Sequence, residues 1–259
     1  MKNLLNIATV VAALSVASLT QACVSDSADE TSESSLEAVV PPKFDLWKNE
    51  GGQYYFHLAA ANGEILLASQ GYDSRMGAIN GVLSVLDNGG ITSRYAIKQG
   101  SNSQYYVSLV AGNNQVIATG EGYSTKSNAT RGVKTMVRNI ASYLQHWDNP
   151  TGARYQIKSA SAHAFSFSLY ASNGEIVLTS ESYTSEAAAL NGAFAVQENG
   201  ADVANYKLLQ AVDGRSYFVL RAKNYETIGV SQMYSTKESA ERAIAAVAAL
   251  VASGKAELL

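Results

Sequence analysis

The string NGEILLASQGY at residues 62–72 returns as NGEIVLTSESY at residues 173–183, and this recurrence decides how the chain folds. Each string ends in a tyrosine that is followed by a polar residue, a serine or threonine, and an alanine-rich segment. Two more tyrosines stand in the same pattern, and successive copies are spaced 51, 60 and 51 residues apart. A unit that returns in this way indicates tandem copies of one supersecondary element. The four tyrosines are Tyr72, Tyr123, Tyr183 and Tyr234.

Two further positions keep a fixed distance from each tyrosine. Counting back 14 residues gives a leucine every time, and counting back 28 gives a phenylalanine or tyrosine. Chance does not place one residue type at fixed offsets in four segments, so the chain carries four copies of one unit. The leucines are Leu58, Leu109, Leu169 and Leu220, and the aromatic residues are Phe44, Tyr95, Tyr155 and Tyr206.

The residues between these positions predict three short strands in every copy. The first segment alternates apolar and polar residues, and the second carries an apolar residue two positions before the leucine, which places both on one face. Asn62-Gly63 and Asn173-Gly174 supply the positive φ that a tight hairpin needs. Residues 65–68 and 176–179 then follow as a third strand.

A helix is expected after each tyrosine. Apolar residues recur there on one face, which suits a helix that covers a sheet. The predicted fold class is therefore α+β, with four tandem ββ-β-α repeats whose antiparallel sheets are each covered by helices. The predicted helix N-caps are Asp73, Ser124, Thr184 and Ser235.

The dipeptide in the middle of each predicted helix differs between odd and even copies. Asn80-Gly81 and Asn191-Gly192 interrupt the helices of copies one and three, whereas copies two and four have Arg131-Gly132 and Arg242-Ala243. Because a glycine inside a helix costs roughly 1 kcal/mol, we expect the odd copies to use this position for close backbone packing.

The domain organisation follows from the same spacing. The long interval between copies two and three contains a turn-rich break at residues 148–152. We therefore expect two pseudo-symmetric pairs, residues 43–149 with copies one and two and residues 150–259 with copies three and four. Each pair is the natural cooperative unit.

The N-terminal residues indicate export. Residues 1–22 have a short basic start and an apolar run, which is typical of a signal peptide. The stretch Leu19–Cys23 resembles a lipobox, so Cys23 is the expected lipidation site, and residues 23–42 form a polar tether. An ordinary signal peptide with an incidental cysteine is the alternative. Val24 lacks the charge of the inner-membrane retention signal, which favours an outer-membrane anchor that faces the periplasm or the surface.

The motif resembles the YegP family of small bacterial proteins, which are built from two tandem copies of such a unit. The similarity rests on residues 62–69, on Gly71-Tyr72, and on residues 78–82, and residues 173–178 with Asn191-Gly192 repeat it. It covers about residues 43–255. The resemblance implies a helix packed on an antiparallel sheet in each repeat, and it implies no activity.

Composition and motifs favour a protein without catalysis. The formal net charge of −3 does not suit a nucleic-acid partner. None of His57, His146 and His163 stands at metal-ligand spacing, and no nucleophile elbow, phosphate loop or dinucleotide fingerprint occurs. We expect no enzyme activity, no cofactor and no metal.

The side of the second strand opposite Phe56 and its equivalents is the predicted binding face. Tyrosine is suited to half-hydrated contacts with sugars, peptides or proteins. The alternative is that these rings are cross-strand pairs that stabilise the sheet. The predicted face comprises Tyr55, His57, Tyr106, Tyr170, Tyr217 and Arg221.

The expected function is a non-catalytic envelope lipoprotein that acts as a binding or scaffold module for a protein or for a cell-wall or polysaccharide ligand. A structural or stress-associated envelope protein without a specific ligand is the first alternative. An enzyme with a site between repeats is the second.

Overall fold

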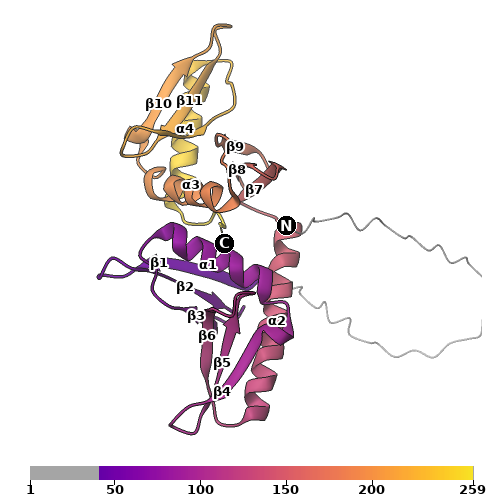
Figure 1. Cartoon of the computed structure of the whole chain (residues 1–259). Coiled ribbons are helices and arrows are strands. Elements are labelled where there is room, and N and C mark those ends of the chain that lie inside the picture. The colour runs from indigo at the N-terminus through magenta and orange to yellow at the C-terminus, as the bar shows by residue number, and fades with distance from the viewer. Residues whose placement is uncertain (1–40, 259) are drawn as a thin grey trace, which may run out of the picture. The chain divides into compact units, whose positions relative to one another are not determined.

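A computed structural model describes residues 41–258 of the chain (Figure 1). The predicted signal segment 1–22, the predicted lipidation site Cys23 and the tether as far as residue 40 lie outside the described residues. Within the described part, no helix combines the length and the apolar composition needed to cross a bilayer.

Copies one and two share a six-stranded antiparallel sheet with the strand order β1-β2-β3-β6-β5-β4. The third strand of each copy pairs with the third strand of the other at the centre of the sheet. The strands are β1 (Lys43–Lys48), β2 (Tyr54–Ala59), β3 (Ile65–Ser69), β4 (Tyr95–Gln99), β5 (Tyr105–Val110) and β6 (Val116–Tyr123), and the helices are α1 (Arg75–Asn88) and α2 (Lys126–Asp148).

Copies three and four build a second sheet with the order β10-β11-β12-β9-β8-β7. The predicted α+β class and the two pseudo-symmetric pairs are therefore confirmed. The strands are β7 (Arg154–Ser161), β8 (Ala164–Tyr170), β9 (Ile176–Thr179), β10 (Tyr206–Gln210), β11 (Ser216–Arg221) and β12 (Thr227–Val230), and the helices are α3 (Glu186–Asn199) and α4 (Lys237–Ala252).

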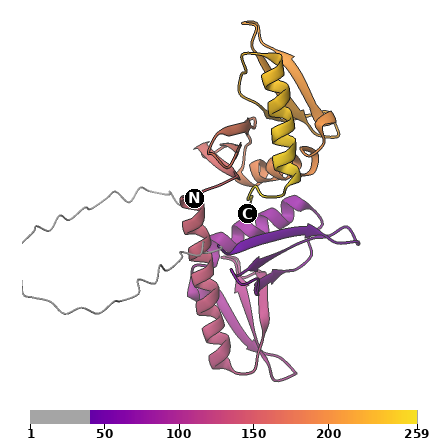
Figure 2. The same cartoon turned by 180° about the vertical axis from the view of Figure 1, so that it is seen from behind.

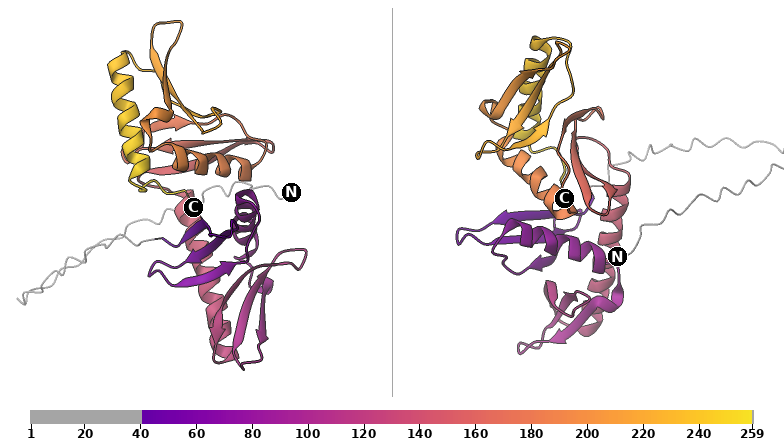
Figure 3. Two further views of the ribbon diagram at one scale, coloured as in Figure 1. Left: turned by 90° about the vertical axis from the view of Figure 1, so that its left-hand side faces the viewer. Right: turned by 45° about the horizontal axis from the view of Figure 1, so that its top comes forward.

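One face of each sheet carries the helices and encloses the core. In the first pair, Phe56 and Leu58 of β2 and Val107 and Leu109 of β5 are fully buried in one core. The helices that pack on these strands are α1 and α2 (Figure 1). In the second pair, α4 lies along β10 and β11, as the view from behind and the side views show (Figures 2 and 3). The aligned positions of the repeat are thus the buried positions of each sheet.

The hairpin between the second and third strands has the positive φ predicted for Gly63 and Gly174, and copies two and four share this backbone. Gly63 and Gly174 have φ of 82° and 83°, while Asn114 and Tyr225 take the same position with φ of 64° and 66°. The Gly63 N–H donates to the Ala60 carbonyl over 2.8 Å and closes the turn. Glycine occupies this conformation without steric cost, whereas the other two residues adopt it less readily.

A serine hydroxyl ends the third strand in three copies. Ser69 Oγ accepts a hydrogen bond of 2.9 Å from the Phe56 N–H, and copies three and four repeat this bond. Copy two has Gly120 at this position, with no hydroxyl to offer. There the backbone pairing continues, and β6 extends to Tyr123.

The repeated tyrosine packs on the helix that follows it. A methyl group added to Gly81 of α1 would lie 2.5 Å from the Tyr72 hydroxyl, and Gly192 stands in the same relation to Tyr183. The structure corrects the expectation that only odd copies use this contact, because Gly132 of copy two packs on Tyr123 in the same way. The alternation of the copies therefore does not come from this glycine.

The helix N-caps lie one residue later than predicted. The side chains of Ser74, Thr125, Ser185 and Thr236 accept the capping hydrogen bonds. The shift arises because backbone hydrogen bonds between Tyr54 and Tyr72 keep the chain extended through the tyrosine. Both residues after the tyrosine are polar, so residue type alone does not distinguish them.

This correction predicts a difference between two neighbouring substitutions. Ser185→Ala removes the acceptor of the Ala188 N–H and should lower the free energy of unfolding by about 1 kcal/mol. Thr184→Ala, at the adjacent exposed position, is the matched control and should change it by less than about 0.5 kcal/mol. Urea unfolding monitored by circular dichroism compares the two, and equal losses would contradict the assignment of the cap.

The two pairs contact each other along α1 and α3. Arg75 Nε donates to Asn191 Oδ1 over 2.7 Å, and its guanidinium forms an ion pair of 2.5 Å with Glu198. Ile79 of α1 is fully buried and belongs to the core of the second pair. The predicted boundary between residues 149 and 150 lies in the segment that joins α2 to β7. That the two pairs fold separately stays a prediction.

Glu186, at the start of α3, is an exposed residue whose carboxyl group is partly desolvated. Burial raises the pKa of its carboxyl group, and the negative charge of Asp87 at the end of α1 raises this pKa further. The ionised carboxylate is therefore disfavoured in the folded protein, and this cost is present above the folded-state pKa.

Glu186→Gln should for this reason raise the melting temperature at pH 7. The advantage should shrink as the pH falls to about 4, near the pKa of an unfolded glutamate, because the wild-type carboxyl group then becomes protonated. Thermal melts at the two pH values measure the effect. Glu198→Gln is the control and should have the opposite sign at pH 7, since it removes the ion pair with Arg75. A lower melting temperature for Glu186→Gln at pH 7 would contradict this account.

Candidate functional site

The helix-free face of the first sheet carries an aromatic cluster. Tyr55 and His57 point away from the core residues of β2, because side chains alternate along a strand. The register of β1 and β2 places Trp47 opposite Tyr55 and Asp45 opposite His57. These four residues, Asp45, Trp47, Tyr55 and His57, are called the Trp47 platform below.

The platform is ordered by contacts among its own side chains. The ring centroids of Trp47 and Tyr55 lie 5.9 Å apart with nearly parallel planes, and those of Trp47 and His57 lie 5.1 Å apart. His57 Nε2 lies 2.9 Å from Asp45 Oδ2, and the Tyr55 hydroxyl donates to Gln53 Oε1 over 3.1 Å. Trp47 remains 41% exposed. The cluster thus presents a solvent-exposed indole next to polar atoms that are held in place by hydrogen bonds.

Asp45 is an ionised acceptor within the platform. Burial acts to raise the pKa of its carboxyl group, but hydrogen bonds from Lys43 and His57 outweigh burial and hold the pKa below its usual value. The Lys43 ammonium lies 2.9 Å from Asp45 Oδ1. The carboxylate therefore fixes His57 on one side and Lys43 on the other.

The other predicted residues do not extend this platform. Tyr106 lies on the same face but on β5, with β3 and β6 between it and β2. Its hydroxyl is bonded to Asn102 and Gln104 at 2.8 and 3.1 Å, and the residue opposite it is Lys98. Tyr217 belongs to the second sheet, where it is half-buried opposite Leu209.

Tyr170 departs from the predicted exposed face. It is only 8% exposed, and the Arg154 guanidinium lies 4.3 Å from the centre of its ring. Arg221 is half-buried, and its Nε has no hydrogen-bond partner among residues 41–258. The six predicted residues therefore lie on two sheets and do not form one surface, because period-two alternation fixes the side of a sheet but not what covers it.

Sequence reasoning missed Trp47 and Asp45. A signal was available, since a hairpin that pairs Phe44 with Leu58 must also pair Trp47 with Tyr55. The alternation of apolar and polar residues in the first strand marks its core face, and it does not by itself indicate which side chains of the opposite face contact each other.

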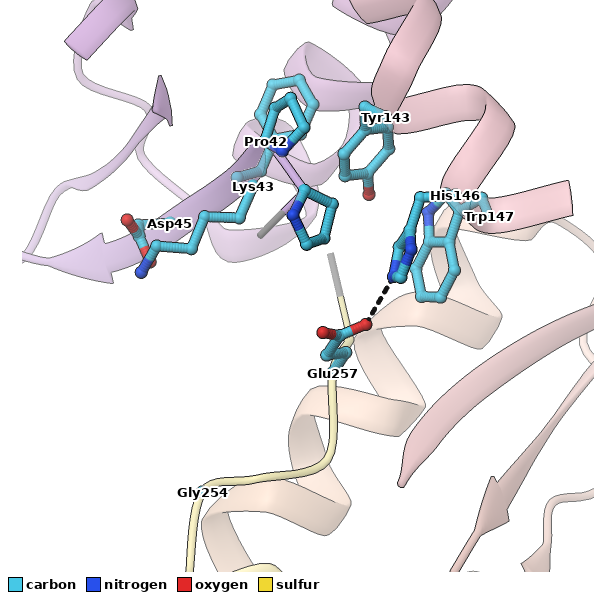
Figure 4. Close-up of a pocket in the computed structure, with 10 residues that line it drawn as sticks. Pro42, Lys43, Asp45, Tyr143, His146, Trp147, Gly254 and Glu257 are labelled. Atoms are coloured by element: carbon cyan, nitrogen blue, oxygen red, sulfur yellow. Dashed lines mark hydrogen bonds and ion pairs between the residues drawn. The ribbon is translucent and has the colours of Figure 1, made fainter. Parts of the chain in front are cut away.

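A cavity of about 250 Å³ lies beside the start of β1 (Figure 4). His146 of α2 and Glu257 near the C-terminus contact each other at its wall, with 2.7 Å between Nε2 and Oε2. The Tyr143 hydroxyl points into the same space (Figure 4). The lining residues are Pro41, Pro42, Lys43, Phe44, Asp45, Tyr143, His146, Trp147, Gly254 and Glu257.

Neither feature resembles a metal centre. Within residues 41–258, histidine, cysteine, aspartate and glutamate side chains form no group of three or more that could hold an ion. His57 and His146 each have one carboxylate partner.

These features define a class: a four-repeat α+β protein with two six-stranded sheets and an aromatic cluster on one open face. Comparison of the sequence with known families matches the domain of unknown function DUF1508 four times, at residues 49–95, 101–142, 160–206 and 211–255. The chain belongs to this family. The resemblance to the YegP family is confirmed.

Individual relatives of known sequence agree with this assignment. The chain is 46% identical over 93 residues to the UPF0339 protein YegP of Yersinia pestis, a match that covers 36% of this chain and 83% of that protein. It is 44% identical over 99 residues to a UPF0339 protein of Pasteurella multocida, which covers 38% and 87% of the two chains. Among solved structures, the solution NMR structure of YegP from E. coli, titled a protein of unknown function, is similar with 34% identity and a TM-score of 0.38 over 40% of this chain and 90% of that chain.

Proposed function

We propose that the protein is a non-catalytic binding module of the bacterial envelope, anchored by a lipid on Cys23, and that the Trp47 platform holds a glycan. The observation that carries the proposal is the exposed, near-parallel pair of Trp47 and Tyr55 beside the His57–Asp45 pair. Tryptophan and tyrosine provide large contact areas at a low cost in side-chain entropy.

The polar atoms of the platform suit a hydroxylated ligand. The apolar face of a sugar ring packs on an indole, and its hydroxyl groups need both donors and acceptors at the edge of the ring. Asp45 supplies a carboxylate acceptor, and the side chains of Gln53 and His57 each carry both hydrogen-bond donor and acceptor atoms. The side-chain contacts within the cluster hold these atoms in place, which lowers the ordering cost of binding.

Copy one alone carries this combination. The positions of Trp47 and His57 correspond to Lys98 and Ser108 in copy two, to Lys158 and Ser168 in copy three, and to Leu209 and Val219 in copy four. The core of the first pair lies on the other face of this sheet, so the exposed part of Trp47 is available to a ligand.

Replacement of Trp47 tests the proposal. Trp47→Ala should weaken binding to isolated cell-wall sacculi or to a responsive glycan by at least about tenfold, because the centre of the contact is lost. Tyr217→Ser, at the position that corresponds to Tyr55 in copy four, is the matched control and should leave binding unchanged. Co-sedimentation and a glycan array provide the measurement. An equal effect of the two substitutions would contradict the platform, and capture of a protein instead of a glycan would change the ligand class.

A structural role is the second candidate, favoured by the direct cross-strand position of Trp47 and Tyr55. Such pairs contribute roughly 0.2–1 kcal/mol to a sheet. A marked fall in melting temperature for Trp47→Ala, together with no binding to any glycan, would support an envelope protein without a specific ligand.

The proposed localisation in the cell envelope can be tested separately. Cys23→Ser should release the protein from the membrane fraction while the repeats remain folded, because one acyl-bearing residue outside the repeats provides the anchor. Fractionation of cells that express each form measures the distribution. An unchanged membrane fraction for the variant would contradict lipidation at Cys23 without affecting the platform.

A further inference from the structure

A buried hydroxyl group, that of Tyr143, points into the cavity of Figure 4 and finds no acceptor among residues 41–258. Tyr143 is 3% exposed, and its ring is held between Phe44 at 5.1 Å and Trp147 at 6.0 Å, both edge to face. No group among residues 41–258 completes a hydrogen bond with its hydroxyl, which points into the cavity (Figure 4). Buried hydroxyl groups are normally paired, so an occupant that brings an acceptor suits this site.

The Tyr143 hydroxyl keeps its proton. Burial raises its pKa well above the usual range, the Trp147 indole N–H, which approaches as a hydrogen-bond donor, acts to lower it, and the negative charges of Glu257 and Glu186 raise the pKa further. A neutral phenol in this position donates to an acceptor that enters the cavity.

Glu257 provides an acceptor on the other side of the cavity. Its backbone is fixed to the start of β7, since the Tyr155 N–H donates to the Glu257 carbonyl over 2.7 Å. Its neighbours Ala256 and Leu258 are buried in the core of the second pair, so the Glu257 side chain points away from that core. Oε2 lies against His146, while Oε1 has no partner among the described residues. An N–H or O–H group of a ligand therefore finds an acceptor there.

The lysine, histidine and carboxylate side chains of the lining each have a polar partner already. Lys43 pairs with Asp45, and His146 faces Glu257. The remaining walls are the apolar rings of Pro41, Pro42, Phe44 and Trp147. At about 250 Å³, the cavity is smaller than the sites that hold drug-sized ligands and much larger than one water molecule. An uncharged, compact group with some apolar surface fits these walls.

We propose that this cavity is a second binding site, separate from the Trp47 platform, that takes an acetamido group. The carbonyl oxygen accepts from the Tyr143 hydroxyl, the N–H donates to Glu257, and the methyl group packs on the rings of Phe44 and Trp147. Acetamido groups occur on N-acetylated sugars and on acetylated lysine, and the shared chemistry does not distinguish these sources.

The two tryptophans of the chain allow the two sites to be read separately. In the full chain with Trp47→Phe, Trp147 is the only tryptophan and reports on the cavity. Millimolar N-acetylglucosamine or N-acetyl-lysine methylamide should change its fluorescence saturably. Glucosamine and lysine methylamide, which lack the acetyl group, should not. The acetylated probe that binds with the lower dissociation constant indicates whether the acetamido group comes from a sugar or from acetylated lysine.

Removal of the hydroxyl group should weaken this binding. Tyr143→Phe in the same background is expected to raise the dissociation constant about three- to tenfold, the effect of one lost hydrogen bond, with an unchanged melting temperature. Tyr155→Phe is the matched control, because it removes another buried hydroxyl that has no partner in the described part of the chain and does not line the cavity. Glu257→Gln should weaken binding as well, since an amide is a poorer acceptor for the ligand N–H.

Three results would overturn the proposal. The first is that the fluorescence of Trp147 shows no saturable response to either acetylated probe. The second is that the probes without the acetyl group produce an equal response. The third is that Tyr143→Phe and Tyr155→Phe change the dissociation constant equally. The Trp147→Phe chain leaves Trp47 as the reporter of the platform. A response confined to Trp47 would support the proposed glycan site and reject the cavity.

Discussion

Pairing between the third strands of neighbouring copies is the interaction on which the rest of the structure depends. Ala68 lies opposite Thr119 and Ser69 opposite Ala118, and these pairs join two three-stranded units into one sheet. A single copy would leave its third strand as an open edge and its apolar face only partly covered. In the second pair, Val230 opposite Thr179 holds the same place. The pair of copies, and not the single copy, therefore encloses a core.

This arrangement separates folding from surface chemistry. The helices occupy one face of each sheet, so the aligned residues that bury against them, such as Phe56 and Phe218, are constrained in every copy. On the helix-free face of the first sheet Tyr55 and His57 remain partly exposed, whereas Tyr170 and Val219 on that face of the second sheet are buried. Copy one has Trp47 and His57 on this face, while copy four has Leu209 and Val219 at the same positions. Repetition supplies a scaffold, and differences among the copies supply the sites.

Strand β1 takes part in both candidate sites. Phe44 contributes to the core and to the wall of the cavity, whereas Trp47 stands on the opposite face of the strand. Lys43 and Asp45 line the cavity, and Asp45 also contacts His57 of the platform. The cavity further requires Glu257, which lies more than two hundred residues away in the sequence. One strand thus connects a surface made within a single copy to a site made from distant parts of the chain.

The sequence by itself determined the number of copies, the order of strands and helices, the positive-φ turns and the buried face, because these depend on short-range periodicity and on Gly63 and its equivalents. It misplaced the helix caps by one residue, since two polar residues follow each tyrosine and only the bridge between Tyr54 and Tyr72 selects the second. It assigned Tyr170 to an exposed face, but Arg154 covers the ring in three dimensions. Only the tertiary structure brought Glu257 to Tyr143 and showed which open-face residues contact one another, because contacts between distant segments leave no periodic trace in a single sequence.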